Sequence, residues 1–387
     1  MPATPGPAAE PPWSSGPDLR LLRATARKFL ETEAVPHRER WEEQRHIDRD
    51  FWRKAGDLGL LCCAVPEQYG GGGGTIAHDL VVIEEQARAL ELGWGNTVQS
   101  GIVAHYLLAY GTEQQKNRCL PALASGEAVA AIAMTEPGAG SDLKALTTQA
   151  VRDGDDYLVT GTKTFISNGG SADLVVLAAK TDPDAGAKGV TLLIADVRDG
   201  QGFHRGRTLR KLGQHTSDTA ELHFDQMRLP AGAVLGEVGR GFAHMMEQLP
   251  QERLCIATIA VASIERAVEL AVEYSRQRRA FGGTLFDLQN TRFELAECAT
   301  LARAGRVFLD DCVARHLDGA LDTATASMAK WWLTDLQCQI VDRCQQLFGG
   351  YGYMWDYPIT RMAADARVQR VYGGANELMK ELIARSL

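Results

Sequence analysis

The segment Tyr157-Leu-Val-Thr-Gly-Thr-Lys-Thr-Phe-Ile166 decides the fold, because its β-branched and aromatic residues favour an extended strand. Similar short segments lie at 172–180, 189–197 and 219–224, with Asp-Gly or Gly-rich turns between them. A hydrophobic period of two, broken by turn residues, is typical of antiparallel strands. The sequence therefore predicts a small antiparallel β-domain over residues 126–236.

Outside this domain the hydrophobic period changes to that of a helix. Between residues 18 and 125, apolar residues recur at three- to four-residue spacing, as at Leu22, Ala26 and Phe29. Longer periodic segments follow at 254–278, 288–316, 322–348 and 376–387. The predicted class is thus α+β, with an all-α domain at 18–125 and an α-helical domain at 237–387. Residues 1–17 are rich in Pro and are expected to form a flexible tail.

The composition is that of an ordinary globular protein, with 45% apolar and 23% charged residues over a length of 387. The 41 basic and 49 acidic residues give a net charge of −8 without a long Lys/Arg run, which argues against nucleic-acid binding. No apolar stretch is long enough for membrane insertion. The eight cysteines lack metal-ligand spacing, so we expect reduced thiols and no bound metal. Residues 1–17 lack an export or import pattern, and we expect a cytoplasmic location.

Five sequence motifs occur in order along the chain. They are Ala131-Ile-Ala-Met-Thr-Glu-Pro-Gly-Ala-Gly-Ser-Asp142, Gly161-Thr-Lys-Thr-Phe-Ile-Ser-Asn-Gly-Gly170, Lys211-Leu-Gly-Gln-His-Thr-Ser-Asp-Thr219, Arg278-Arg-Ala-Phe-Gly282 and Gln346-Leu-Phe-Gly-Gly-Tyr-Gly-Tyr353. Together they resemble the signatures of the acyl-CoA dehydrogenase family. The segments 250–253, 352–355 and 373–377 resemble most closely those of its long-chain branch. The resemblance implies that family's fold: an N-terminal helical domain, a central antiparallel β-domain and a C-terminal four-helix bundle.

The resemblance also implies FAD as the cofactor. Residues expected near the flavin ring and its substituents are Met134, Thr135, Gly140, Ser141, Phe165 and Ser167. Residues expected at the pyrophosphate and adenosine are Arg278, Phe281, Gln346, Gly349 and Gly350. Further expected contacts to FAD are Gln289, Ala375, Asn376 and Glu377. Because Arg278, Phe281 and Gln346 match residues that complete a neighbouring subunit's FAD site, we expect a homotetramer built as a dimer of dimers. Many relatives have Trp, Thr and Thr where this chain has Phe165, Ser167 and Ala375.

From the residues alone, two of these segments have a second interpretation. Thr135, Gly140 and Ser141 fit a simple β-turn as well as a turn that holds a ligand. Arg278 fits a solvated residue of the basic cluster 276–279 as well as a pyrophosphate ligand, although its planar fork suits a pyrophosphate. The resemblance to the family favours the cofactor role in both cases.

The segment Arg370-Val-Tyr-Gly-Gly-Ala-Asn-Glu377 lacks an expected carboxylate. Many members of the family have a glutamate after the Tyr, and this glutamate removes the α-proton of the acyl thioester, whereas this chain has Gly373. The resemblance assigns the base to Glu252 instead, while the Gly373 N–H still donates to the thioester oxygen. The alternative is that Glu252 is a first-turn carboxylate, stabilised by the helix dipole just after Pro250. Glu377 and Glu381 are rival bases.

The implied activity is the FAD-dependent oxidation of an acyl-CoA thioester to the trans-2-enoyl-CoA, as in fatty acid β-oxidation, on medium- or long-chain or branched acyl groups. The implied electron acceptor is an electron-transfer flavoprotein. Residues expected to contact the substrate are Ser141, Gln251, Arg253 and Gly374, although Arg253 fits an ion pair at the subunit surface equally well. Three alternatives stay open: an oxidase that uses O2, an enzyme for acyl-carrier-protein thioesters, and an inert acyl-thioester-binding protein.

Overall fold

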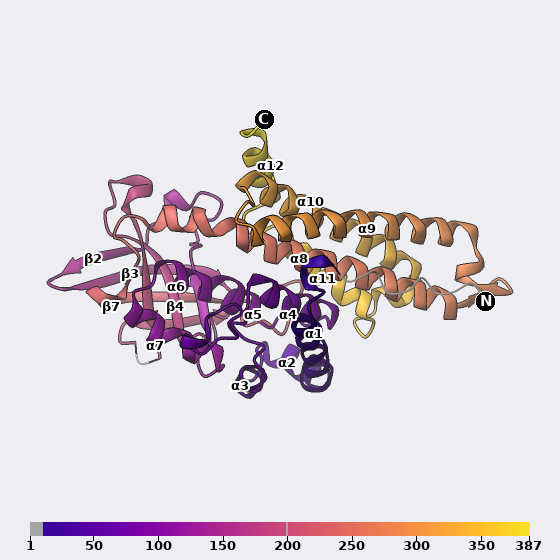
Figure 1. Cartoon of the computed structure of the whole chain (residues 1–387), viewed down its shortest axis with the longest axis horizontal. Coiled ribbons are helices and arrows are strands. Elements are labelled where there is room, and N and C mark those ends of the chain that lie inside the picture. The colour runs from indigo at the N-terminus through magenta and orange to yellow at the C-terminus, as the bar shows by residue number, and fades with distance from the viewer. Residues whose placement is uncertain (1–10, 199) are drawn as a thin grey trace.

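The structure is a computed structural model that describes residues 11–198 and 200–387. A helical N-terminal part, a central β-sheet and a long C-terminal helical part follow one another along the chain (Figure 1). Helix α7 ends at Ala124 before strand β1 begins at Ala130, and β8 ends at Leu235 before α8 begins at Gly241. The boundaries proposed at residues 126 and 237 fall in these two connections.

The N-terminal part packs around helix α4, Ile76–Arg88, in which nearly every residue is buried. Helix α4 contacts α1 on one side and the C-terminal helix α8 on the other. The other helices of this part are α1 (Pro17–Phe29), α2 (Arg38–Gln44), α3 (Arg49–Asp57), α5 (Asn96–Val98), α6 (Ala104–Tyr110) and α7 (Glu113–Ala124).

The central part is one sheet in the strand order β6-β7-β3-β2-β4-β5-β8, with β1 beside β4. Its strands are β1 (Ala130–Ala133), β2 (Gln149–Asp153), β3 (Asp156–Ile166), β4 (Leu174–Lys180), β5 (Val190–Asp196), β6 (Phe203–Thr208), β7 (Ala220–Pro230) and β8 (Val234–Leu235). The pairing is antiparallel, as expected, except that β4 runs parallel to β1 and, at a single residue pair, to β2. Strand β4 carries side chains buried on both faces because helices cover one of them.

The C-terminal part is built on helix α8, Gly241–Gln277. Helices α9 (Gln289–Leu317) and α10 (Thr323–Leu347) pack along it, and α11 (Pro358–Gln369) and α12 (Asn376–Ala384) pack on α10. A short hairpin, β9 (Arg279–Ala280) and β10 (Gly283–Thr284), joins α8 to α9. Helix α8 begins before the periodic segment predicted from residue 254 and contains Pro250, and periodicity alone did not single out α11. The expected order of a helical part, a central β-sheet and a second helical part is nevertheless confirmed.

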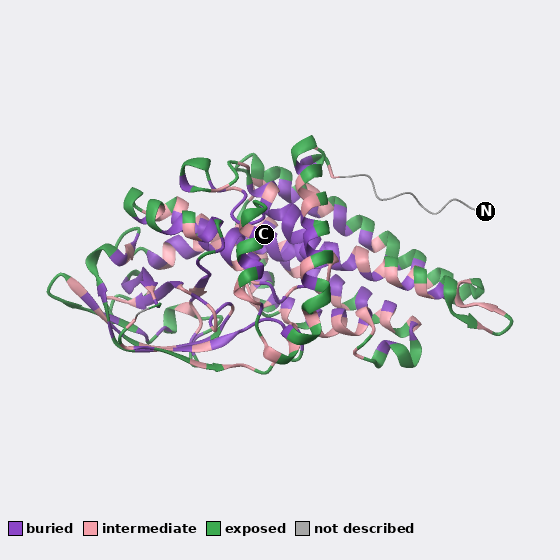
Figure 2. Cartoon of the chain, turned by 90° about the horizontal axis from the view of Figure 1, so that it is seen from below, coloured by how far each residue is buried: buried purple, intermediate pink, exposed green. Residues whose placement is uncertain are grey.

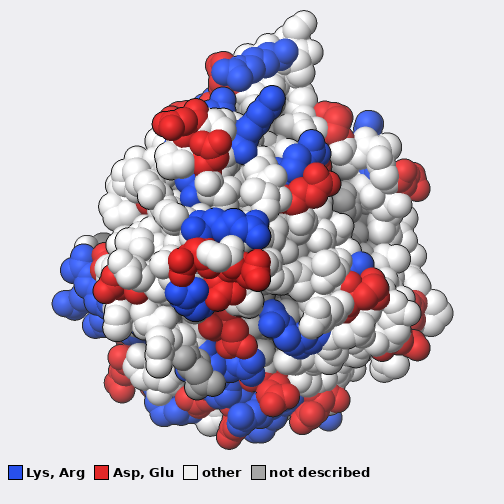
Figure 3. Space-filling view, turned by 90° about the vertical axis from the view of Figure 1, so that its left-hand side faces the viewer, with Lys and Arg blue, Asp and Glu red and all other residues white. Residues whose placement is uncertain are grey.

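The buried residues gather where α4, α8 and α10 meet, whereas the far ends of α8 and α9 are largely exposed (Figure 2). On the β-domain end of the molecule, basic and acidic side chains lie interspersed (Figure 3). Ion pairs such as Arg228–Asp153 and Arg207–Glu221 account for part of this pattern. Within the described residues, no helix has the length and apolar character required to cross a bilayer.

The flexible tail predicted over residues 1–17 is only partly testable, because residues 1–10 lie outside the described residues. Residues 11–17 do not fit that prediction. Pro12–Ser14 form a 3-10 turn in which Trp13 and Ser14 are buried. The Trp13 Nε1–H donates to Asp310 Oδ1 at 2.9 Å, on helix α9. A large aromatic side chain therefore attaches this segment to the C-terminal helices.

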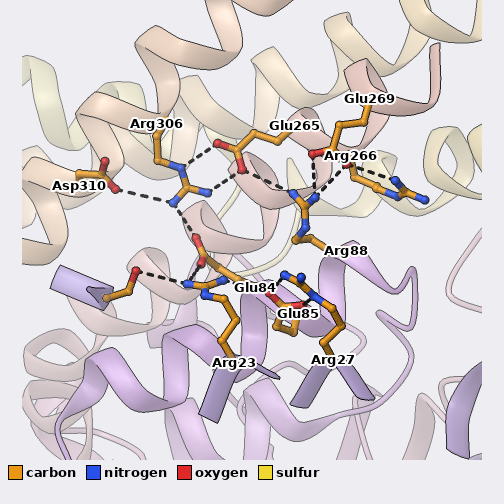
Figure 4. Close-up of polar contacts among 11 residues, drawn as sticks. Arg23, Arg27, Glu84, Glu85, Arg88, Glu265, Arg266, Glu269, Arg306 and Asp310 are labelled. Atoms are coloured by element: carbon orange, nitrogen blue, oxygen red, sulfur yellow. Dashed lines mark hydrogen bonds and ion pairs between the residues drawn. The ribbon is translucent and has the colours of Figure 1, made fainter. Parts of the chain in front are cut away.

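A network of ion pairs connects the N-terminal helices to α8 and α9 (Figure 4). Arg306 on α9 donates to both carboxylate oxygens of Glu265 at 2.9 Å, and to Glu84 on α4 at 2.6 Å. Glu84 also accepts from Arg23 on α1 at 2.8 Å. Glu84 and Arg306 are both buried, so their charges are compensated within this network and not by solvent.

We predict that Arg306→Met lowers the free energy of unfolding by about 3 kcal/mol, because it leaves Glu84 and Glu265 without their shared buried partner. Denaturant unfolding of the FAD-loaded protein measures this loss. Arg315→Met is the matched control, since Arg315 lies on the same helix in an exposed ion pair with Asp311, and its removal should change stability little. Equal effects of the two substitutions would contradict the assignment.

Candidate active site

The turn after β1 carries Met134 and Thr135, and strand β3 holds it in place. Thr164 N–H donates to the Thr135 carbonyl at 2.9 Å. The buried Lys163 ammonium donates to the Met134 carbonyl at 3.1 Å and to Glu136 Oε1 at 2.8 Å. The structure therefore brings the Met134–Thr135 turn directly beside the end of β3, where two further predicted flavin residues lie.

Those two residues are Phe165 and Ser167, and the face that they share with the turn is open. The Phe165 side chain is 68% exposed, and its backbone has a positive φ of 59°. Gly140 and Ser141 are exposed as well. An added Cβ at Gly138 or Gly140 would meet no atom within 4 Å, so the chain's own packing leaves space over this turn. An open face with an aromatic ring and hydroxyl donors fits the ring of a flavin.

A second group of predicted cofactor residues lies at the other end of the C-terminal helices. Arg278, Gln346, Gly349 and Gly350 line one pocket of about 640 Å³, and the Arg278 guanidinium lies 5.5 Å from the centre of the Tyr351 ring. Two predicted residues stand apart from this pocket lining. Phe281 is 92% exposed in the β9–β10 hairpin, and Gln289 is exposed at the first position of α9.

Helix α8 separates these two groups. It begins against β5, where an added Cβ at Gly241 would lie 2.8 Å from backbone atoms of Thr191 and Leu192. It ends immediately before Arg278, 37 residues later. At 1.5 Å per residue the helix is about 55 Å long, which is too far for one dinucleotide to span. Residues at the two ends of this helix are therefore too far apart to contact one dinucleotide.

Glu252 lies in the interior of α8 and not in its first turn, because the helix begins at Gly241 and Pro250 is inside it. Stabilisation by the dipole of a helix N-terminus is therefore excluded as the reason for this carboxylate. Its side chain is buried, and the Tyr106 hydroxyl donates to Oε1 at 2.8 Å. Burial raises the pKa of Glu252 to about 7, against the opposing effects of the Tyr106 hydrogen bond and Arg253.

Gly373 faces the same side of α8. It has a φ of +63°, and an added Cβ there would lie 2.3 Å from Ile256 Cδ1. Ile256 lies one helical turn after Glu252 on the same face of α8. The structure thus brings Glu252 and the Gly373 loop to one side of the helix. Any side chain at 373 would be strained by the backbone conformation and would collide with Ile256.

A buried lysine on α10 holds the Gly373–Gly374 loop in place. Lys330 on α10 donates to the Gly374 carbonyl at 2.6 Å and to Asn376 Oδ1 at 2.8 Å. The Asn376 amide donates in turn to Thr334 Oγ1 and Asp335 Oδ1, both at 3.0 Å. Burial lowers the pKa of Lys330 to about 7, with Arg253 adding to the effect. The predicted cofactor residue Asn376 therefore uses its side chain to fix the loop, while Ala375 and Glu377 flank it.

Gln251 and Arg253 have internal partners. Gln251 donates to the Gly101 carbonyl at 2.9 Å and lies 3.2 Å from His316 Nε2. Arg253 is only 2% exposed and donates to Ser327 Oγ at 3.2 Å, so the alternative of an ion pair at the subunit surface is wrong. Its Nε–H has no hydrogen-bond partner within residues 11–198 and 200–387. Gly374 joins Gly373 in the loop, whereas Ser141 remains on the open face of the β-domain.

Three site residues were not found from the sequence. Lys330 left a signal, because it is a lysine on the apolar stripe that includes Ala326, Ala329 and Leu333. Lys163 is part of a motif and sits among alternating strand residues, yet its buried position could not be read from that pattern. Tyr106 gave no signal in the sequence, because its partner Glu252 is 146 residues away.

Comparison with known proteins decides the family. Three family models match in order: the acyl-CoA dehydrogenase N-terminal domain at residues 16–127, the middle domain at 131–227 and the C-terminal domain at 239–387. The chain belongs to the acyl-CoA dehydrogenase family. The long-chain specific acyl-CoA dehydrogenase of Rattus norvegicus, a mitochondrial protein, is 45% identical over 370 residues, which cover 95% of this chain and 86% of the rat protein.

Two solved acyl-CoA dehydrogenase structures match over nearly the whole length. The enzyme of Geobacillus kaustophilus has a TM-score of 0.93 and 45% identity, covering 96% of this chain and 98% of its own. A glutaryl-CoA dehydrogenase of Mycobacterium smegmatis in complex with FADH2 has a TM-score of 0.89 and 28% identity, covering 96% of this chain and 94% of its own. Members of this acyl-CoA dehydrogenase family are flavoproteins that use FAD.

We predict that Lys330→Met loosens the Gly373–Gly374 loop, because it removes the ammonium that donates to the Gly374 carbonyl and to the Asn376 side-chain oxygen. Amide hydrogens in residues 370–377 should exchange about tenfold faster, as measured by mass spectrometry. Lys380→Met is the control, since Lys380 lies on α12 with its ammonium 5.0 Å from the Trp331 ring centre and holds no loop carbonyl. Unchanged exchange in Lys330→Met would show that Lys330 does not hold the loop.

Proposed function

We propose that the protein is an FAD-dependent acyl-CoA dehydrogenase that oxidises an acyl thioester to the trans-2-enoyl form with Glu252 as the base. The observation that carries this proposal is a buried carboxylate on the face of α8 that also packs against Gly373. The position at which many members of the family carry the base is Gly373 in this chain. Glu252 is a buried glutamate on the face of α8 that this loop packs against. Glu377, by contrast, is exposed in the first turn of α12.

The residues present fit FAD. Met134, Thr135, Gly140, Ser141, Phe165 and Ser167 would hold the flavin portion, and Arg278, Gln346, Gly349 and Gly350 would hold the pyrophosphate and adenosine of a neighbouring subunit's cofactor. Phe281, Gln289, Ala375, Asn376 and Glu377 are the further proposed contacts. When bound, FAD supplies the acceptor for the hydrogen that leaves the β-carbon. The exposed Phe165 and Phe281 rings are apolar surfaces that a bound cofactor would cover.

In this mechanism the chain performs two tasks. The Glu252 carboxylate takes the α-proton, and its pKa of about 7 lets it be ionised near neutral pH and still bind a proton readily. The Gly373 N–H donates to the thioester oxygen where negative charge develops. Lys330 fixes the loop that carries this N–H. The buried Arg253 guanidinium favours the ionised form of Glu252.

The proposed substrate is a medium- or long-chain or branched acyl-CoA, and the proposed electron acceptor is an electron-transfer flavoprotein. Of the proposed substrate residues, Gln251 and Arg253 would support the part of α8 that carries the base. Ser141 and Gly374 would contact the thioester portion of the substrate. A cytoplasmic location also stays a proposal, since the rat relative is named as mitochondrial. A panel of acyl-CoA thioesters, with acyl-carrier-protein thioesters beside it, distinguishes the carriers by anaerobic flavin bleaching.

We predict that Glu252→Gln keeps FAD and binds acyl-CoA but reduces the flavin at least about 10²-fold more slowly, because the base is lost. Anaerobic stopped-flow absorbance measures this rate. A wild-type rate across the acyl-CoA panel would make the assignment wrong and would turn attention to Glu377 or Glu381.

A base returned to position 373 gives a sharper test. In the Glu252→Gln background, Gly373→Glu should restore part of the rate, preferentially for short straight chains. Because the new Cβ would collide with Ile256, adding Ile256→Ala should increase the rescue. With Glu252 present, Gly373→Glu should not help, because two carboxylates would compete for one position.

We further propose a homotetramer, built as a dimer of dimers, in which α8 carries Arg278 into a neighbouring subunit's cofactor site. Glu252→Gln and Arg278→Ala chains, each impaired alone, should complement each other when co-expressed and purified together with two different tags. A mixed pair then contains one intact site, formed by Glu252 of one chain and Arg278 of the other, so about half of the sites in such pairs recover.

The control for this experiment is a chain that carries both substitutions, co-expressed with the Glu252→Gln chain. That mixture has no intact Glu252 and should stay inactive. A lack of recovery in the first mixture, or a solution mass of one chain with FAD fully bound, would rule out the shared site.

A further inference from the structure

Tyr106 connects the N-terminal helices to the proposed base. It lies on α6, is 0% exposed, and donates its hydroxyl to Glu252 Oε1 at 2.8 Å. Its ring lies 6.1 Å from that of Tyr110, nearly edge-on, which limits its rotation. The phenol therefore reaches the carboxylate from a different domain and from a fixed direction.

The two oxygens of the Glu252 carboxylate have different surroundings. Within the described part of the chain, the Tyr106 hydroxyl is the sole hydrogen-bond donor to this carboxylate, and it uses Oε1. Oε2 accepts no hydrogen bond from the described residues, so it is the oxygen left to bind a proton. A glutamate has three rotatable side-chain torsions, and a base must lie within hydrogen-bond reach of the proton that it removes. One fixed oxygen restricts the other to a narrow range of positions.

We propose that Tyr106 is the positioning residue of the catalytic base: its hydroxyl fixes Oε1 of Glu252, presents Oε2 to the substrate α-carbon, and keeps the carboxylate ionised until the proton is transferred. This inference rests on the proposed function of Glu252. In the step itself, the α-C–H bond breaks, its proton forms an O–H bond with Oε2, and its electron pair remains on the substrate. The Tyr106 proton stays on the phenol.

Several charged or titratable groups lie around Glu252 and its neighbours. Tyr106, Arg253 and Cys255 interact with Glu252 itself. Tyr110 acts on Tyr106, Asp79 acts on Cys255 and Arg253 acts on Lys330, while Gly373 and Gly374 carry no titratable side chain. Burial and the Glu252 charge raise the pKa of Tyr106 well above 10, so the phenol remains a donor throughout an assay near neutral pH. Arg253 favours the ionised carboxylate, whereas burial opposes it.

The sign of the Tyr106 effect follows from its geometry. A hydrogen bond donated to a carboxylate stabilises the ionised form, so it lowers the pKa that burial alone would give. Removing this bond raises the pKa of Glu252 above its wild-type value. Since the base acts only when ionised, the rate should fall most on the acidic side of the pH profile, and the loss of the contact that fixes Oε1 should also lower the alkaline plateau.

The test is the pH profile of anaerobic flavin reduction in Tyr106→Phe, with the holoenzyme and a saturating acyl-CoA such as dodecanoyl-CoA. The substitution keeps the ring and removes only the hydroxyl. We expect unchanged FAD content and an acidic limb displaced upward by about one pH unit, equivalent to an about tenfold lower rate below the wild-type midpoint. A profile of unchanged midpoint, whether the rate falls uniformly or not at all, would overturn the proposal.

Tyr110→Phe is the matched control, because Tyr110 lies one turn further along α6 and donates to Glu247 Oε2 at 2.8 Å instead. Its profile should keep the wild-type midpoint. An infrared titration of the carboxylic-acid C=O band, with Glu252→Gln as the blank, gives a readout that needs no turnover. This band should persist to higher pH in Tyr106→Phe, and an unshifted band would also overturn the proposal.

A variant that strengthens the hydrogen bond guards against a folding defect in Tyr106→Phe. A fluorinated tyrosine incorporated at position 106 is a more acidic phenol and a better donor, and it should displace the acidic limb downward. A limb that stays in place would count against the proposal. If Glu252→Gln is inactive but neither Tyr106 variant moves the limb, the proposed function stands and the role of Tyr106 fails; if Glu252→Gln is fully active, the proposed base itself fails.

Discussion

The length of helix α8 is the constraint on which the rest of the structure depends. One uninterrupted helix of 37 residues starts against strand β5, carries Glu252 in its interior and ends beside the pocket around Arg278. Because a helix is stiff along its axis, these three points cannot move independently. The β-domain and the far pocket of one chain are therefore held apart by the length of this helix.

The same helix creates an electrostatic problem at its centre. Glu252 and Arg253 are both buried, and Lys330 is buried on the facing helix. Isolated charges at such positions would be costly, and here each is offset by a specific group: Tyr106 and Arg253 for the carboxylate, Ser327 for Arg253, and the Gly374 carbonyl with Asn376 for Lys330. The charges therefore remain compensated only while α6, α8, α10 and the 373–374 loop stay together. The ion pairs around Arg306 hold the N-terminal helices in that arrangement from another side.

The fold could be predicted from the sequence because it depends on local signals. The change of period at residues 157–166, the helical stripes on either side and five ordered motifs were sufficient for the architecture and the family. Pro250 shows where local signals fail: a proline fits a helix start, as in the alternative considered for Glu252, whereas packing of α8 against α4 and α10 carries the helix through it. Trp13 was assigned to a tail because a Pro-rich segment gives no sign of its distant partner Asp310.

The candidate site was predictable only in part, for a similar reason. Glu252 and Gly373 were linked through a resemblance that assigns one the task missing at the other, and the structure adds what this exchange requires. Tyr106 and Lys330 act through partners 146 and 44 residues away, which neither periodicity nor spacing reveals. Arg253 was ambiguous because an arginine is usually exposed, and its burial follows from the helices that enclose it.

Gly373 and the carboxylate at position 252 belong to one packing arrangement. Ile256 occupies the space into which any side chain at 373 would project, and Glu252 lies one turn earlier on the same face of α8. Helix α8 thus contributes an apolar side chain, Ile256, and a carboxylate, Glu252. The loop contributes only its backbone at Gly373. Glycine at 373 keeps its backbone N–H as a donor. It also lets the loop lie close to Ile256, where a larger residue would not fit without movement of that side chain. A side chain at 373 therefore requires the Ile256 side chain to move and the loop to keep a positive φ, so the residue at 256 influences how well a glutamate at 373 is accommodated.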